Sequence, residues 1–278
     1  MTTHPSPSPD DLRALAERAA RSAAPALLAA FRSDMSVSFK RDVHDVVTIH
    51  DRAAEATIAG ILQDGAPGSV ILGEETGSSG DAPLRWIIDP IDGTANFARG
   101  LAYWCISIAA ELDGEVVAGV VFDPVADNMF SADREHAHVN GVPMRSASGP
   151  AELSTLLTSF PGQHDVDLLG EGAFDLLAEI TRTYQHHHST GSGALNLAHV
   201  AAGWADATMG FDTHPWDVAA GAHILERAGG TYTGFRSGVE VARAQESLDY
   251  VAEGAGGEHG VLIRRLRALS GQWMPAGQ

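Results

Sequence analysis

The feature that most constrains this 278-residue chain is an apolar strand that ends directly in two acidic residues. Residues 86–97 read Trp-Ile-Ile-Asp-Pro-Ile-Asp-Gly-Thr-Ala-Asn-Phe. Pro90 fixes its own φ and has no N–H, so the turn between Asp89 and Asp92 is stiff. The sequence therefore predicts a rigid strand end that presents two carboxylates.

The residues after this turn suggest what the carboxylates bind. Gly93 lets the backbone approach a ligand closely. A helix that starts near Thr94 would point its free N–H groups at the same place. Carboxylates beside such amides indicate metal ions held between the acids and a phosphate. The alternative is an ordinary turn in which Asp89 is a cap and Asp92 lies on the surface.

Other ends of predicted elements carry acids as well, namely Glu74, Asp217, and the pair Asp45 and Asp51 around an apolar segment at 46–49. Acids that converge without Lys or Arg repel one another, and burying them unpaired is costly. Bound divalent cations resolve that conflict. Because the ligands are hard oxygens, Mg²⁺ or Mn²⁺ is favoured over zinc. Two such ions could activate water for phosphoryl transfer.

Charge and cysteine content exclude several classes of protein. Lys and Arg number 18 and Asp and Glu 36, so the formal charge is −18. This balance argues against sequence-independent binding of nucleic acid and against docking to an anionic membrane. The single cysteine, Cys105, permits no intrachain disulfide and is expected in the core. We see no signal peptide and no apolar span, so a cytoplasmic protein is expected.

The chain is organised as a flexible tail at 1–9 and one catalytic domain at 10–278, with halves at about 10–150 and 151–270. In the first half, the pattern predicts helices at 10–31, with Asp10 as a cap, and 51–63, and strands at 69–72, 85–88, 103–112 and 115–122. Turns at 113–114 and 140–141 are typical of hairpins, so we expect an antiparallel sheet.

The second half alternates between strands and helices. It predicts strands at 154–160, 185–189, 205–209, 230–234 and 248–252, and helices at 172–183, 192–203, 217–228 and 259–269. This alternation is typical of an α/β arrangement. The fold class is therefore mixed, part α+β and part α/β.

Three segments, 73–76, 86–97 and 216–230, resemble the inositol monophosphatase family, and 45–51 is similar to an upstream segment of that family. The resemblance extends over about residues 10–265. It implies a layered αβαβα sandwich, the sugar-phosphatase-like fold. It also implies Mg²⁺-dependent hydrolysis of phosphate monoesters, a homodimer and inhibition by lithium.

The resemblance also implies a role for each motif residue. A first metal would be held by Glu74, Asp89 and the carbonyl of Ile91, a second by Asp89, Asp92 and Asp217, and a third, weaker one by Glu74 through water. Thr94, with Asp51 behind it, would orient the attacking water. The chemistry agrees, because a Thr hydroxyl accepts from water only if its own proton goes elsewhere. The amides of Gly93 and Thr94 would bind phosphate oxygens.

The substrate side follows the family less closely. The segment 191–196 is similar to a helix start that faces the substrate, with Ser192 and Gly193 in place of Thr and Ala; Asp92 and Asp217 are expected beside them. Enzymes specific for inositol phosphate carry a Glu seven residues before the motif Asp, and that position here is Gly210. Asp212 is a possible substitute, unless strand alternation points it elsewhere. A Glu at 210 is expected to restore the ring contact.

The expected reaction is hydrolysis of inositol 1-phosphate to inositol and phosphate. Histidinol phosphate, 3′-phosphoadenosine 5′-phosphate, fructose 1,6-bisphosphate and glycerol 2-phosphate are alternative substrates. The segment 205–217 has no Arg or Lys, which disfavours the nucleotide and the bisphosphate. A regulatory binding protein without catalysis is an alternative of another class. Its signature would be the loss of a metal ligand, and all the motif acids are present.

Basic and histidine residues near these motifs have less defined roles. Lys40 or Arg41 could assist the third metal or steer phosphate, or could simply be solvated. His214 could contact the substrate or pack beside the motif. The run 186–188 is three histidines, and because side chains on a strand alternate between faces, they cannot all hold one ion.

Overall fold

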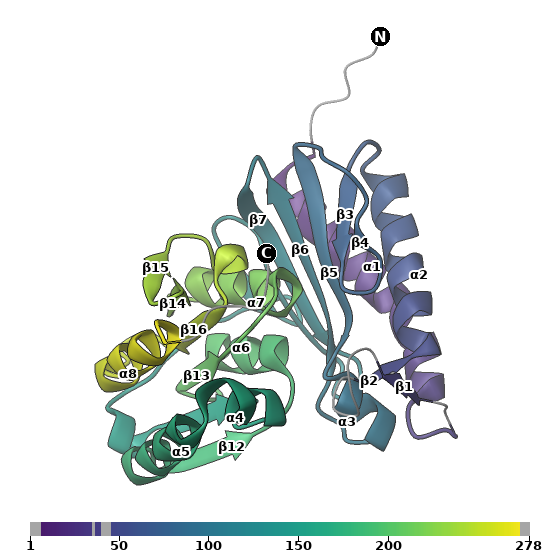
Figure 1. Ribbon diagram of the computed structural model, residues 1–278. Coiled ribbons are helices and arrows are strands. Elements are labelled where there is room, and N and C mark those ends of the chain that lie inside the picture. The colour runs from purple at the N-terminus through teal and green to yellow at the C-terminus, as the bar shows by residue number, and fades with distance from the viewer. Residues whose placement is uncertain (1–6, 35–36, 40–45, 273–278) are drawn as a thin grey trace.

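The computed structural model describes residues 7–34, 37–39 and 46–272, and Figure 1 shows their arrangement. The expectations for Lys40, Arg41 and Asp45 concern residues outside these ranges, as does most of the expected N-terminal tail. In the described part, no helix is long and apolar enough to cross a membrane.

Helix α1 (Pro9–Ala30) begins before the predicted position. Ser8, not Asp10, is the N-cap, and its hydroxyl accepts the Asp11 amide at 3.2 Å while Asp11 Oδ2 accepts the Ser8 amide at 3.0 Å. The prediction that Asp10 is the cap was wrong, because the helix begins one residue earlier at Pro9, and Pro at the first helical position needs no N–H partner.

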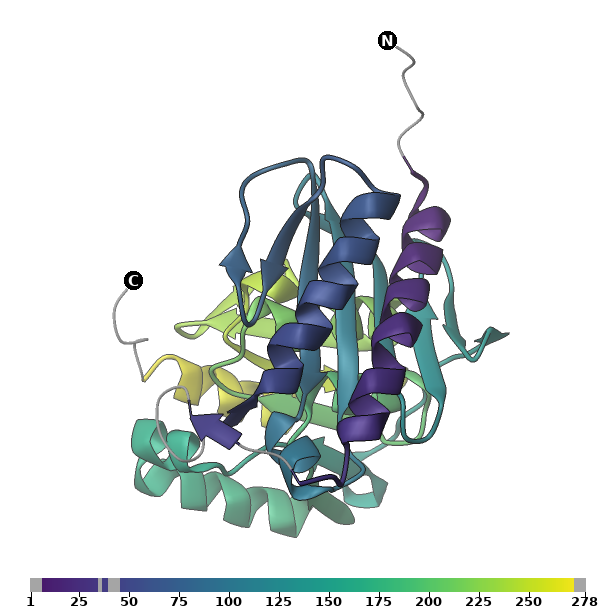
Figure 2. The ribbon, with the colours of Figure 1, turned by 90° about the vertical axis from the view of Figure 1, so that its right-hand side faces the viewer.

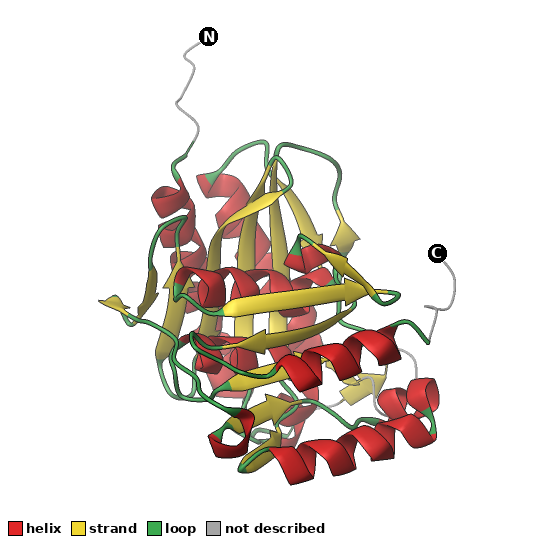
Figure 3. Cartoon of the chain, turned by 90° about the vertical axis from the view of Figure 1, so that its left-hand side faces the viewer, coloured by secondary structure: helices red, strands yellow, loops and turns green. Residues whose placement is uncertain are grey.

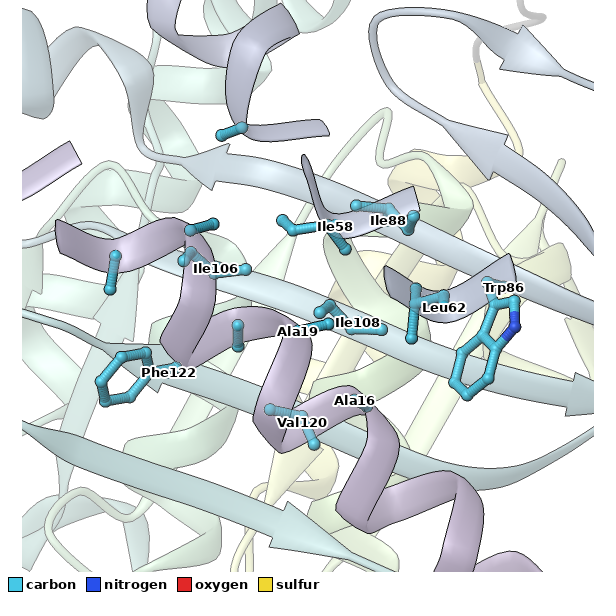
Figure 4. Close-up of a cluster of buried hydrophobic side chains, with 14 of the residues drawn as sticks. Ala16, Ala19, Ile58, Leu62, Trp86, Ile88, Ile106, Ile108, Val120 and Phe122 are labelled. Atoms are coloured by element: carbon cyan, nitrogen blue, oxygen red, sulfur yellow. The ribbon is translucent and has the colours of Figure 1, made fainter. Parts of the chain in front are cut away.

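Helices α1 and α2 (Ile49–Gly65) lie side by side on one face of the first sheet (Figure 2). Figure 4 shows the contact, in which Ala16 and Ala19 of α1 and Ile58 and Leu62 of α2 face Trp86, Ile88, Ile106, Ile108, Val120 and Phe122 of the sheet. Each fully buried aliphatic side chain of this kind contributes about 1.5–3 kcal/mol. This apolar layer fixes α2, and with it Asp51, against the sheet.

The first sheet has eight strands in the order β10-β9-β8-β7-β6-β5-β3-β4. Its strands are β3 (Val70–Gly73), β4 (Gly77–Ser78), β5 (Leu84–Asp92), β6 (Cys105–Leu112), β7 (Glu115–Asp123), β8 (Asn128–Ala132), β9 (Ala137–Val139) and β10 (Val142–Pro143). All pairs are antiparallel as expected except β3 with β5, which is parallel because β4 first returns the chain along the edge. The hairpin predicted at 113–114 joins β6 to β7, with positive φ at both residues.

The second sheet has six strands in the order β12-β11-β13-β16-β14-β15. They are β11 (Thr155–Thr158), β12 (His186–Ser189), β13 (Ala207–Gly210), β14 (Thr231–Arg236), β15 (Val239–Val241) and β16 (Asp249–Glu253). The sheet is mixed: β11 is parallel to β12 and β13, and β16 is antiparallel to β13 and β14. A separate two-stranded sheet pairs β1 (Val37–Phe39) with β2 (Val46–Thr48).

Helices α6 (Gly193–Ala201) and α7 (Pro215–Arg227) lie between the two sheets, and α5 (Glu171–Thr183) and α8 (Gly260–Ser270) cover the outer face of the second (Figures 1 and 3). Three separate apolar clusters join these layers. The layered αβαβα sandwich is therefore confirmed.

Several short elements were missed by the sequence analysis. They include α4 (Gln163–Leu169), the strands β4, β8 and β15, and two 3₁₀ turns at Ala151–Leu153 and Ala244–Glu246. Each is too short for a hydrophobic period to stand out. The hairpin expected at 140–141 joins β9 to β10, and the helix expected near Thr94 is α3 (Thr94–Arg99). Helices α3 and α4 contribute to the site described next.

Candidate active site

The two acids of the strand end lie on β5, and a bulge sets their direction. Asp89 pairs with Ser107 and Asp92 with Cys105, so β5 uses three residues where β6 uses two. In a regular strand, residues three apart point to opposite faces, whereas the extra residue of a bulge turns them to the same side. The stiff turn predicted at Pro90 is this bulge.

The carboxylates of Asp89, Asp92 and Asp217 converge. One oxygen from each lies within 4.8 Å of the others. Asp217 comes from the first turn of α7, where its Oδ2 accepts the His214 amide at 2.7 Å. Glu74 follows β3, with its amide donating to the Ile88 carbonyl at 3.1 Å, and it interacts with Asp89. These four residues are called the acid cluster below.

The acid cluster is electrostatically strained. Burial, together with repulsion from Glu74, Asp92 and Asp217, raises the pKa of Asp89 well above its usual range. Burial and Asp217 raise the pKa of Asp92 to about 6. No ion pair among the described residues joins Asp89, Asp92 or Asp217 to a Lys or Arg. Converging hard oxygens with no cation suit Mg²⁺ or Mn²⁺, so the residues fit the expected metal.

Thr94 and Asp51 meet beside the cluster. Thr94 Oγ1 lies 3.0 Å from Asp51 Oδ1 and 2.9 Å from the Ile91 carbonyl oxygen. Asp51 is fully buried in α2, and its Oδ2 accepts the amide and hydroxyl of Thr48 at 2.8 and 2.7 Å. Either acceptor can therefore receive the hydrogen bond that the Thr94 hydroxyl donates, which leaves the lone pairs of Oγ1 available to a water.

Glu55 is a residue that the sequence analysis missed. It is 1% exposed, and its carboxylate accepts the Glu75 amide at 2.9 Å and the Thr76 hydroxyl at 2.5 Å. A Cβ at Gly73 would overlap this carboxylate. Glu55 therefore fixes the turn that carries Glu74. The available signal was its position four residues after Asp51, which places both acids on one face of α2.

The start of α6 holds Asp92 in place. Asp92 Oδ2 accepts the Ser192 hydroxyl at 2.5 Å and the Ala194 amide at 2.8 Å, and Cys105 Sγ lies 3.7 Å away. Ser192 was expected to face the substrate, but it is 1% exposed and its hydroxyl is directed to Asp92. Gly193, its neighbour, does line the cleft described below. Cys105 is buried, as predicted.

Asn96 was also missed. Its side-chain amide donates to the carbonyls of Tyr103 and Thr190, at 2.7 and 2.8 Å. It thus ties α3 to the segment before α6, two parts of the chain that are 94 residues apart. Gly93, the N-cap of α3, has φ of +94°, and a Cβ there would lie 3.1 Å from the Tyr103 carbonyl oxygen. These two observations explain why the turn at Gly93 and the first turn of α3 need a glycine and an asparagine.

A cleft of about 230 Å³ adjoins the acid cluster. Asp92 and Asp217 line it, and so do Asp165 and Asp212, which come from α4 and from the segment between β13 and α7. Asp212 Oδ2 is 2.5 Å from His164 Nε2. Asp212 therefore faces the cleft, so strand alternation does not point it away from the substrate side.

Gly210 lines the same cleft, but it has no room for a side chain. A Cβ there would lie 2.7 Å from Tyr250 Cε1 and 3.2 Å from Thr213 Cγ2. The Glu that is expected to restore a ring contact at this position would therefore require the Tyr250 ring to move, and its effect on inositol phosphate stays a prediction.

The histidines divide as follows. His214 stacks on Trp216, with ring centroids 5.0 Å apart, and its Nδ1 lies 3.7 Å from Asp217 Oδ2. His187 Nε2 is 2.9 Å from the Thr158 hydroxyl, whereas His186 and His188 stack on each other. The three adjacent histidines thus alternate along β12, as predicted.

Comparison with known proteins gives a consistent answer. The model of the inositol monophosphatase family matches residues 8–270. "Nus factor SuhB" of Pseudomonas aeruginosa is 37% identical over 229 residues, which are 80% of this chain and 84% of the relative. The extragenic suppressor protein suhB of Bartonella henselae superposes with a TM-score of 0.78 at 31% identity, covering 92% of this chain and 97% of that one.

An inositol monophosphatase from Anabaena (Nostoc) superposes with a TM-score of 0.77 at 28% identity, covering 95% and 96% of the two chains. The match of the family model is continuous through both sheets and includes every member of the acid cluster. From its sequence, its fold and its relatives, the chain belongs to the inositol monophosphatase family.

Proposed function

We propose that this protein is a Mg²⁺-dependent phosphatase of small phosphate monoesters. The observation that carries the proposal is the acid cluster beside the Thr94–Asp51 pair, with a cleft for the alcohol part of an ester next to both. Glu74, Asp89, the Ile91 carbonyl, Asp92 and Asp217 would hold two ions, with Mn²⁺ as a substitute and a third, weaker site at Glu74. Bound there, the metal would polarise the phosphate and make a water more acidic.

The chain's own groups orient the reactants. Thr94 Oγ1 donates its hydrogen bond to Asp51 or to the Ile91 carbonyl and accepts a hydrogen bond from the attacking water. The amides of Gly93 and Thr94 stand at the start of α3, where phosphate oxygens would lie. The alcohol leaves into the cleft lined by Gly193, Asp212 and Asp217.

Inositol 1-phosphate is the first ester to test, because family membership suggests it. The chain lacks the ring-binding Glu at position 210, and Tyr250 occupies that space. The other candidate esters therefore belong in the same assay.

The test is phosphate release by the purified protein, with and without Mg²⁺, from inositol 1-phosphate, histidinol phosphate, 3′-phosphoadenosine 5′-phosphate, fructose 1,6-bisphosphate and glycerol 2-phosphate. Asp89→Asn is the blank. We also propose that the protein is a homodimer, and light scattering measures its molecular mass in solution. We expect Mg²⁺-dependent release from at least one ester. Release that persists in Asp89→Asn would contradict the metal assignment.

A regulatory role is the second candidate, because curated relatives carry the name "Nus factor SuhB". In this chain the complete acid cluster favours catalysis. A folded protein that is not stabilised by Mg²⁺ with an ester analogue, and that releases no phosphate from any ester, would instead support the regulatory role.

A further inference from the structure

We propose that the cleft selects phosphate esters whose alcohol carries a protonated amine. The proposal rests on the phosphatase function above and concerns a second acid group, defined as Asp165, Asp212 and Asp249. Two of these line the cleft, and Asp249 lies directly behind the backbone of Asp212. The acid cluster contributes Asp92 and Asp217 to the same cleft.

The first argument is charge. None of the described residues that line the cleft is Lys or Arg. Metal ions would offset the acid cluster but not the second acid group. The partially exposed ring of His164, paired with Asp212, supplies at most one positive charge against three carboxylates. A neutral polyol would leave this charge uncompensated, whereas an ammonium would compensate it.

The second argument is an unsatisfied carboxylate. Asp249 is fully buried in β16, and its Oδ1 accepts the Asp212 amide at 3.2 Å. Its Oδ2 is buried and has no hydrogen-bond partner of normal geometry among the described residues, although the nearby Ser270 hydroxyl partly offsets the rise in the pKa of Asp249. Burial raises the pKa of Asp249 and of Asp165 to about 6 in each case, with repulsion from Asp212 adding to both. A buried carboxylate in this condition is stabilised by a cation bound nearby.

The third argument is the wall of the cleft. Phe160, Phe211 and Tyr250 line it, and the first two rings have centroids 5.7 Å apart. Aromatic rings attract cations through the ring quadrupole, and the two Phe rings offer no hydrogen-bond acceptors to a hydroxyl. Gly210 makes room for the third ring of this wall, because a Cβ at that position would overlap Tyr250. Acids and aromatic rings together suit an ammonium.

The test uses two esters that differ only in the group of interest. Ester one is 2-aminoethyl phosphate and ester two is 2-hydroxyethyl phosphate, so that an ammonium replaces a hydroxyl of similar size. We expect kcat/KM to favour the amine by about tenfold or more, since a charge-assisted hydrogen bond is involved. Asp212→Asn should raise KM for the amine with kcat unchanged, and it should raise KM for the hydroxyl ester by a much smaller factor, so that the preference for the amine falls. Asp165→Asn should act in the same direction.

Asp167→Asn is the matched control, because Asp167 is an exposed acid on the same helix, α4, and does not line the cleft. Calorimetry with 2-aminoethylphosphonate and 2-hydroxyethylphosphonate in Mg²⁺ gives a binding readout that does not depend on turnover. The same preference is expected there.

The outcomes separate this inference from the proposed function. If no ester tested in either assay is hydrolysed, the phosphatase function itself fails. Equal kcat/KM for the aminoethyl and hydroxyethyl esters would overturn the amine selectivity while the phosphatase function stands. A preference for the amine that survives both Asp212→Asn and Asp165→Asn would overturn the assignment to the second acid group.

Discussion

Two groups of acids share one cleft and are built differently. Asp89 and Asp92 are 3% and 8% exposed and lie on a central strand. The side chain of Asp212 is 20% exposed, lies in the short segment between β13 and α7, and is paired with an exposed histidine. Asp92 accepts buried hydrogen bonds from Ser192 and Ala194 at the start of α6, whereas the second acid group comes from α4, a connecting segment and β16.

The difference indicates that the residues proposed to bind metal ions and those proposed to contact the alcohol lie on different kinds of element. Positions that bind metal ions and orient water must be fixed to within a fraction of an ångström, so they sit on rigid, buried elements. Asp212, which we propose to contact the alcohol, lies in a short connection and can change without disturbing the core. The predictions below test this separation, starting with the largest effect.

Asp89→Asn should lower Mg²⁺-dependent phosphate release by at least about 10³-fold, because an amide cannot replace a shared anionic ligand. Without metal, the variant should be more stable than the wild type by roughly 1 kcal/mol, since one repelling buried carboxylate is gone. Phosphate assays and thermal unfolding in EDTA measure the two effects. An active variant would show that Asp89 is not a metal ligand.

Thr94→Val should lower kcat by about 10²-fold and leave KM nearly unchanged, because it removes the hydroxyl that would orient the water. Thr94→Ser keeps that hydroxyl and is the matched control, with kcat expected close to wild type. Equal losses in both variants would mean that the methyl group, and hence packing, is what matters.

Glu55→Gln should raise the Mg²⁺ concentration needed for half-maximal activity by about tenfold. The reason is that an amide oxygen accepts the hydrogen bonds from the Glu75 amide and the Thr76 hydroxyl less strongly than a carboxylate does. A Mg²⁺ titration of activity and of thermal stability measures the change. Asp64→Asn, an exposed acid on the same helix, is the control and should show no shift. An unchanged Mg²⁺ titration in Glu55→Gln would remove Glu55 from the support of Glu74.

The smallest expected effect is on stability as a function of pH. Because burial raises the pKa of Asp92 from 3.8 to about 6, the folded protein binds more protons than the unfolded chain between about pH 4 and 6. The free energy of unfolding should therefore fall as pH rises through this window. A change of roughly 1 kcal/mol corresponds to about 2–4 °C in Tm for a domain of this size.

The measurement is Tm at pH 5 and pH 7.5, in EDTA and in Mg²⁺. We expect a higher Tm at pH 5 in EDTA, and a smaller difference in Mg²⁺, which favours the ionised acids. Asp92→Asn in EDTA should reduce the difference. A metal-free protein whose Tm rises from pH 5 to pH 7.5 would contradict the raised pKa.

Much of the fold could be predicted from periodicity. The long helices α1, α2 and α7 and the hairpin β6–β7 carry strong patterns, and they lie within a few residues of the predicted positions. Most of the short elements did not show in the sequence, because two to seven residues give no clear period. The parallel pairing of β3 with β5 depends on β4, an edge strand of two residues.

The sequence by itself determined that stiff, acid-bearing turns end the apolar strands, and that the acids outnumber any cation that could pair with them. These are local properties, set by residue type and by the restricted dihedrals of Pro90. Tertiary structure decided the rest: that Ser192 is directed to Asp92, that Glu55 supports the turn of Glu74, and that Tyr250 fills the space beside Gly210. Those contacts join elements far apart in the chain, and only packing of the layers brings them together.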